Sequence, residues 1–196
     1  MGPILVLYYS KHGSIKRLAD AIAQGVQSSE HQVMVRTVPE ISSNGTADEP
    51  TNGPPYVTLS DLENCSGLAL GSPTYFGNMA APLKHFLDSS TAQWLKGALI
   101  NKPACVFTSS SSMHGGQETT LLSMMLPLLH HGMVICGLPY SEPELHATTS
   151  GGTPYGVSHH AVNTQSALSK EEKALCVAQG KRLAHMAQAL CSIKQD

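Results

Sequence analysis

The fold is decided near the start of the chain, by the sequence ILVLYYSKHGSIKRLADAIAQGV at residues 4–26. Residues 4–9 form a continuous apolar run, which predicts a strand buried on both faces of a parallel sheet. Polar residues and a glycine follow at 10–14. An apolar stripe with helical spacing then begins: Ile15, Leu18, Ala19, Ile22, Ala23 and Val26. Such a stripe is typical of a helix lying on a sheet, so the order strand, tight turn, helix predicts an α/β domain.

The remaining chain repeats this alternation. Further strands are predicted at 31–38, 66–72, 104–108 and 133–136, and further helices at 79–87, 117–131 and 169–191. Pro127 is expected to kink its helix or end it early. The last helix opens on a capping box at Ser169 and Glu172, and its buried face is predicted to run from Cys176 to Cys191.

Strict alternation predicts a parallel sheet with helices on both faces. Five strands suit a flavodoxin-like three-layer sandwich with the strand order 2-1-3-4-5. We expect residues 1–196 to form a single domain, with long loop insertions at about 40–58 and 139–168. Loops of that length in a compact domain are candidates for function or assembly.

Composition excludes several classes of protein. Twelve Lys and Arg against 14 Asp and Glu give a net charge of −2, which argues against binding of nucleic acid or of an anionic membrane surface. The chain has five cysteines, an odd number, and none of them show C-x-x-C spacing. Both observations argue against a disulfide scaffold or a zinc ribbon. No metal site is predicted. No signal peptide or stretch of roughly 18–20 apolar residues is visible, so we expect a cytoplasmic protein without a transmembrane segment.

Ligands of open α/β sheets bind beyond the carboxyl ends of the strands, where this chain has three unusual segments. The first, Ser10–Ile15, offers two hydroxyls, a glycine and a helix N-terminus, which suit a phosphate group. It matches neither the Walker A pattern nor G-x-G-x-x-G. The alternative is an ordinary strand–helix turn with Ser14 as the N-cap.

The other two segments suit a flat heterocycle. Tyr75 and Phe76, between Gly71 and Gly77, would form an aromatic platform at a strand end. The alternative is a packed loop with both rings tucked inward. Residues 109–116 are rich in hydroxyls and backbone N–H groups that could bond the edge of a polar ring, or they form a flexible loop. The two neighbouring histidines at 130–131 are more typical of helix capping or packing than of ligand binding.

Two other enzyme classes of related architecture lack their motifs here. The first loop has no C-x5-R, as low-molecular-weight tyrosine phosphatases require, and the chain has no G-x-S-x-G of an α/β-hydrolase. A phosphate loop, an aromatic platform and a polar loop together describe a site for flavin mononucleotide (FMN). With no obvious acid–base or nucleophilic group, we expect the cofactor to carry the chemistry.

Six segments resemble the WrbA family of flavodoxin-like NAD(P)H:quinone oxidoreductases. They are LVLYYS (5–10), GSPT (71–74), FGNM (76–79), GGQE (115–118), HHGMVI (130–135) and GGTPYG (151–156), in the family's order. The resemblance implies two-electron, ping-pong reduction of quinones with NADH or NADPH as the donor. The alternatives are a flavodoxin-type electron carrier, which its near-neutral charge disfavours, and a non-enzymatic regulatory interaction protein.

The resemblance also implies roles for individual residues. Trp94 and His12 would line the substrate pocket, with Trp94 contributed by a neighbouring subunit of a homotetramer. Tyr75 departs from the family, which usually has arginine there, so the positive charge is missing. The implied FMN contacts are Ser10, Lys11, His12, Gly13, Ser14, Ile15, Pro73, Thr74, Tyr75, Phe76, Gly77, Ser109, Ser110, Ser111, Ser112, Met113, His114, Gly115 and His130.

Overall fold

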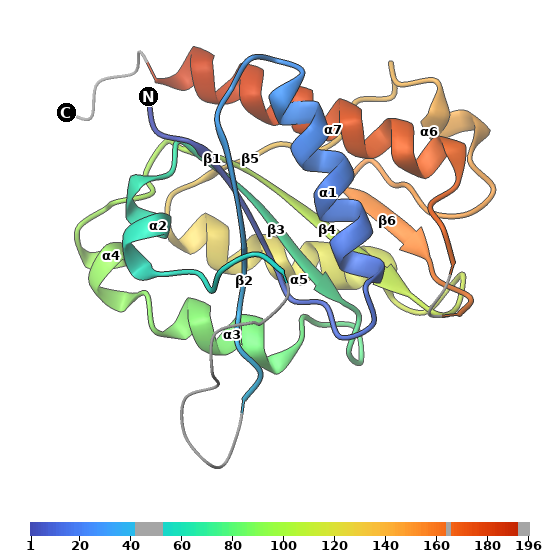
Figure 1. The fold of residues 1–196 in the computed structure, drawn as a ribbon, viewed down its shortest axis with the longest axis horizontal. Helices are drawn as coiled ribbons and strands as arrows, with labels where there is room; N and C mark the ends of the chain where they lie inside the picture. Colours follow the sequence, from blue (N-terminus) through green and yellow to red (C-terminus); the bar gives the residue numbers. More distant parts are fainter. Residues whose placement is uncertain (42–52, 164–165, 192–196) are drawn as a thin grey trace.

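The structure is a computed structural model that describes residues 1–41, 53–163 and 166–191. A parallel sheet lies at its centre, with the order β2-β1-β3-β4-β5 and a further strand, β6, paired to β4 (Figure 1). The strands are β1 (Ile4–Tyr8), β2 (Val33–Thr37), β3 (Gly67–Pro73), β4 (Pro103–Ser110), β5 (Val134–Ile135) and β6 (Val157–His160). The predicted order is confirmed, and the predicted count of five strands is corrected to six.

Helices cover both faces of the sheet, which confirms the three-layer prediction (Figure 1). One face carries α1 and α7, and the other carries α2, α3 and α5. The helices are α1 (Ser14–Gln27), α2 (Leu59–Asn64), α3 (Ala81–Asp88), α4 (Thr91–Leu95), α5 (Gln117–His130), α6 (Glu144–Ala147) and α7 (Lys170–Leu190). No helix in the described part of the chain is long and apolar enough to cross a membrane.

The backbones of α1 and α7 pack directly against each other. A Cβ atom added at Gly25 would lie 2.2 Å from the Val177 carbonyl oxygen, and one added at Gly180 would lie 2.1 Å from that of Ile22. Two glycines therefore permit the approach that buries the predicted apolar stripe of α1 against the sheet.

The predicted loop at 139–168 is wrong in part, because it contains α6 and β6. Strand β6 has the sequence VSHH, which lacks the apolar run that predicts a buried strand. It pairs in parallel with residues 107–110 of β4. The layer formed by α1 and α7 covers one face of it. Residues 42–52 of the other predicted loop lie outside the described residues.

Several boundaries also differ from prediction. Strand β4 extends to Ser110, since its pairing with β6 continues the ladder past the apolar run. Helix α5 passes through Pro127 and ends three residues later. The capping box at Ser169 is confirmed, with both reciprocal hydrogen bonds to Glu172 formed. Cys191, predicted on the buried face of the last helix, is exposed at the C-cap of α7, beyond the helix's contact with the sheet.

Candidate functional site

A cleft of about 280 Å³ opens where β1, β3, β4 and β6 end. All three predicted segments contribute to it, as expected for the carboxyl edge of a parallel sheet. A fourth segment, after β6, completes the wall and was not predicted. The lining residues are Ser10, Lys11, His12, Ser14, Ile15, Pro73, Thr74, Tyr75, Ser109, Ser110, Ser111, Ala161, Val162 and Asn163.

The first loop lines the cleft beside the N-terminus of α1. Gly13 has a φ of 84° and is the N-cap of α1, while Ser14 is its first helical residue, so the alternative with Ser14 as N-cap is wrong. The hydroxyl oxygen of Ser10 accepts hydrogen bonds from the backbone N–H groups of Gly13 (3.1 Å) and Lys16 (3.3 Å). These contacts fix the loop at the N-terminus of α1, and a helix N-terminus favours an anion.

Arg17 brings a positive charge to this loop. Its Nη2 donates to the hydroxyl oxygen of buried Ser14 at 3.2 Å. Arg17 was not among the residues predicted for the phosphate site. Its position three residues after Ser14, one helical turn along, was the available signal.

A line of buried hydroxyls supports Thr74 from behind. The Thr74 hydroxyl oxygen lies 3.3 Å from that of Thr108 and 3.1 Å from that of Thr120. Thr108 and Thr120 are fully buried, and Thr108 donates to the Ser72 carbonyl at 2.7 Å. Neither was predicted, because only the fold brings the first turn of α5 behind the end of β3. These contacts fix Thr74, which lines the cleft.

The aromatic pair faces solvent, so the alternative of a packed loop is wrong. Tyr75 lines the cleft and is 42% exposed, while Phe76 is fully exposed with a φ of 51°. A bulky residue rarely adopts this left-handed backbone conformation. Reciprocal backbone hydrogen bonds between Tyr75 and Asn78 (2.9 and 3.0 Å) hold the turn. Gly77, at φ 78°, completes it.

The third loop lines the cleft only with its first residues. Gln117 Nε2 donates to the Ser110 hydroxyl oxygen at 3.0 Å, and that hydroxyl donates to the Ser112 carbonyl at 2.6 Å. Ser112, Met113 and His114 lie on an exposed turn, and they do not line the cleft, nor does Gly115. Their predicted FMN contacts stay predictions.

Trp94 and His130 lie together, away from the cleft. Trp94 belongs to α4 and not to a loop; it is 49% exposed, and its Nε1 donates to the His130 carbonyl at 2.9 Å. His130 ends α5, whose start lies beside Thr74, so its 14 residues separate the two ends by about 20 Å. A single chain therefore does not bring either residue to its own cleft.

His131 has a structural role, in agreement with the capping interpretation. It is the C-cap of α5, and its Nε2 lies 3.0 Å from the Ser90 hydroxyl oxygen. Burial and, after it, the charge of neighbouring His130 lower the pKa of His131. The ring is therefore held neutral near pH 7.

Glu172 is a buried carboxylate with several hydrogen-bond partners, close to the cleft wall that follows β6. One carboxylate oxygen accepts from the N–H groups of Gly151 (2.9 Å) and His160 (3.0 Å). The other accepts from Ser169 N–H (2.9 Å) and His159 Nδ1 (2.7 Å). Burial alone would raise the pKa of Glu172, but the hydrogen bonds, that of His159 foremost, outweigh it and lower the pKa to about 2.

The lowered pKa of Glu172 predicts a loss of stability in acid. Its contribution is complete above its ordinary pKa of 4.5 and disappears as the pH falls through about 2. We expect the free energy of unfolding to fall by about 3 kcal/mol over that window because of this group. Urea titrations at a series of pH values would measure it. Glu172→Gln should flatten the acid dependence and Glu171→Gln should not; parallel curves for all three proteins would contradict the assignment.

The chain is similar to proteins of known family. A family model described as NADPH-dependent FMN reductase matches residues 3–141. A protein from Geotalea daltonii named NAD(P)H dehydrogenase (quinone) is 40% identical over 200 residues, which cover 95% of this chain and 97% of that protein. A protein of the same name from Gluconacetobacter diazotrophicus is 40% identical over 198 residues, covering 97% and 99%.

Solved structures share the fold. A flavodoxin, WrbA-like protein from Agrobacterium tumefaciens superposes with a TM-score of 0.70 at 22% identity, covering 96% of this chain and 99% of that one. A flavodoxin from Bacillus cereus superposes with a TM-score of 0.60 at 16% identity, covering 93% and 97%. Both likenesses confirm the flavodoxin-like architecture that the order of strands and helices predicted.

Proposed function

Because the chain belongs to the NADPH-dependent FMN reductase family, we propose that it is an FMN-dependent NAD(P)H:quinone oxidoreductase. The observation that carries the proposal is the cleft itself. It combines a helix N-terminus, a wall of hydroxyls and an exposed aromatic at the carboxyl edge of the sheet. No carboxylate is among its described lining residues, and its titratable groups are Lys11, His12 and Tyr75.

The residues present fit FMN. The Ser10 oxygen accepts two backbone hydrogen bonds, which leaves its own hydrogen available to an anion. Gly13 has no Cβ to cover the start of α1, and Arg17 places a cation beside Ser14. A single phosphate fits this short loop better than a pyrophosphate does.

In the proposed reaction the chain binds and orients, while bound FMN supplies the hydride chemistry between nicotinamide and quinone. Thr74, which lines the cleft, is held in place by its buried hydroxyl neighbours before any ligand arrives. Tyr75 and Phe76 offer stacking surface to flat ligands. One cleft serves both substrates, so the donor must leave before the quinone enters, which is ping-pong kinetics.

We propose further that the protein is a homotetramer whose sites neighbouring subunits complete. Leu122, Leu126 and Leu129 are 44%, 59% and 54% exposed and share one face of α5. Trp94 and Leu95, 49% and 73% exposed, extend the apolar surface onto α4. Apolar surface of this extent favours contact with another protein. A second copy could bring Trp94 and His130 to a cleft that their own chain does not reach.

The function is tested by the colour and the turnover of the purified protein. We expect a yellow protein with one FMN per chain that oxidises NADH or NADPH only when a quinone is added. A colourless protein that does not take up FMN would contradict the proposal. A flavoprotein that reduces partner proteins and no quinone would favour the alternative of an electron carrier.

The loop at residues 10–15 predicts that FMN binds and that FAD binds poorly. Ser10→Ala with Ser14→Ala should weaken FMN binding, because each hydroxyl bonded to a charged group contributes about 1.5–3 kcal/mol. Fluorescence titration of the apoprotein would measure both effects. Ser29→Ala, just beyond the opposite end of α1, is the matched control and should bind FMN as the wild type does. Tight, stoichiometric FAD binding would contradict the assignment of the loop.

A further inference from the structure

The fourth wall of the cleft, Ala161–Asn163, follows β6 directly. Ala161 extends the sheet, since its N–H donates to the Ser110 carbonyl at 2.8 Å. Val162 is 68% exposed, and apolar packing therefore contributes little to its position. Polar contacts must therefore hold this wall in place.

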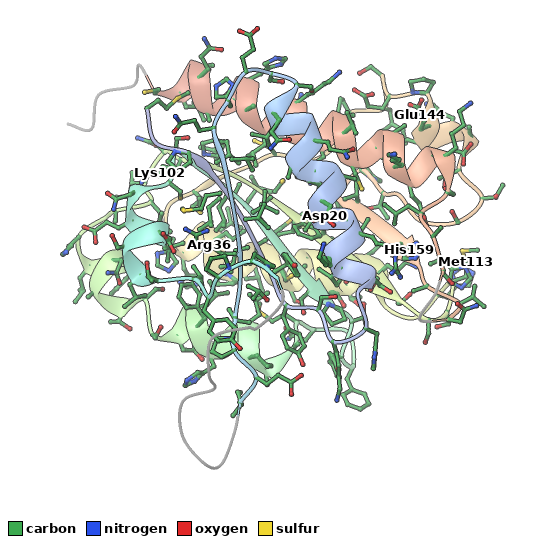
Figure 2. All side chains as sticks on the ribbon, in the orientation of Figure 1. Asp20, Arg36, Lys102, Met113, Glu144 and His159 are labelled. Atoms are coloured by element: carbon green, nitrogen blue, oxygen red, sulfur yellow. The ribbon has the colours of Figure 1, made fainter. Side chains whose placement is uncertain are left out.

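His159 belongs to β6, two residues before the wall begins, and its side chain reaches Glu172 of α7 (Figure 2). It is 1% exposed, and its Nδ1 lies 2.7 Å from the Glu172 carboxylate. Its Nε2 lies 3.3 Å from the Ser166 carbonyl oxygen. A carboxylate and a carbonyl only accept hydrogen bonds, so both contacts are satisfied only when each ring nitrogen carries a hydrogen.

Ser166 connects His159 to a residue of the cleft wall. Its N–H donates to the Asn163 carbonyl at 3.1 Å, and its hydroxyl oxygen accepts from the Asn163 N–H at 3.0 Å. Asn163 lines the cleft. A continuous line of contacts therefore runs from α7 through Glu172, His159 and Ser166 to the wall.

We propose that His159 is a positioning residue of the cofactor site, which through its Nε2 contact with Ser166 holds the 161–163 wall in the place that FMN requires. The inference rests on the proposed function, because FMN is the ligand that this wall would meet. The wall is also supported by the β4–β6 ladder, by the His160 N–H bonded to Glu172 and by the Val162 N–H bonded to the His160 carbonyl. His159 has a second role, as the partner of Glu172, and the two roles use different ring nitrogens.

Two substitutions separate these roles. An asparagine amide can reach the position of Nδ1, so His159→Asn keeps the contact with Glu172 and loses that with Ser166. A glutamine amide can reach the position of Nε2, so His159→Gln does the opposite. We expect the FMN dissociation constant to rise about tenfold in His159→Asn and to stay within about threefold of wild type in His159→Gln.

Stability should follow the reverse order. The hydrogen bond to the buried carboxylate is charge-assisted and the stronger of the two, so apo His159→Asn should melt closer to the wild type than apo His159→Gln. A merely structural histidine would make FMN affinity follow the melting temperature. The inference is overturned if His159→Gln binds FMN no more tightly than His159→Asn.

Gln179 provides a matched control at the other end of β6. Its Oε1 accepts from the Val157 N–H at 2.9 Å and its Nε2 donates to the Val106 carbonyl at 3.2 Å. Gln179→Leu should lower the melting temperature and leave FMN affinity unchanged. A tenfold weakening in this variant as well would overturn the inference, because loosening β6 anywhere would then suffice.

Hydrogen exchange of the apoprotein keeps this test separate from that of the proposed function. Amides of residues 160–163 should exchange faster in His159→Asn than in His159→Gln. If wild-type protein fails to bind FMN, the proposed function is contradicted, and the exchange order alone decides whether His159 holds the wall. Equal exchange in the two variants overturns the inference even when the wild type binds FMN.

Discussion

Replacing Gly71 with alanine is expected to lower the free energy of unfolding by about 3 kcal/mol, toward the upper end of the cost of overpacking a core. The added Cβ would lie 2.1, 2.2 and 2.6 Å from three ring atoms of Phe107. That ring is fully buried, and Gly71 lies on β3, between β1 and β4. Neither the ring nor the strand can move without disturbing the sheet. Denaturant unfolding of the apoprotein would measure the loss, which is large beside a typical total of about 5–15 kcal/mol.

Gly67 provides the control for this prediction on the same strand. A Cβ added there would meet the Ile4 Cδ1 atom at 2.9 Å, and that atom is the end of a flexible side chain. We expect Gly67→Ala to cost about 1 kcal/mol. In the double variant Gly71→Ala with Phe107→Leu, the clashing side chain is smaller, and part of the lost free energy of unfolding should be recovered. A Gly71→Ala protein as stable as Gly67→Ala would contradict the prediction.

Replacing Trp94 with alanine is expected to leave FMN binding intact and to lower kcat/KM for quinone by about 10- to 100-fold. The expectation rests on the proposed tetramer, in which Trp94 of one subunit covers the cleft of another. An aromatic wall contributes both stacking and buried area to a flat substrate. Within the described part of its own chain, Trp94 does not line the cleft, and its indole N–H donates to the His130 carbonyl. Steady-state kinetics and FMN titration separate the two effects.

Two further measurements test the role proposed for Trp94. Sedimentation should show a species of about four times the chain mass of 20.8 kDa. Trp94→Phe, which keeps a ring and loses the hydrogen bond to His130, should retain most of the activity. A fully active monomer, or a Trp94→Ala variant with unchanged kinetics, would contradict both the assembly and the substrate role.

The sequence by itself determined the architecture and the location of the site. Apolar runs followed by helical stripes are local patterns, and their strict alternation leaves few topologies open. The carboxyl ends of parallel strands lie at one edge, so Ser10, Thr74 and Ser109 could be placed together without coordinates. These conclusions needed only the period of the apolar residues and the glycines and hydroxyls between them.

Only the tertiary structure decided which side chains support the site. Strand β6 is short and polar, and His159 is buried there because Glu172, 13 residues further along, supplies a carboxylate to it. Thr120 reaches Thr74 across 46 residues of sequence. Such contacts carry no periodic signal, since a polar residue is buried only when a partner from another element satisfies its hydrogen bonds. The fold must be complete before those partners meet.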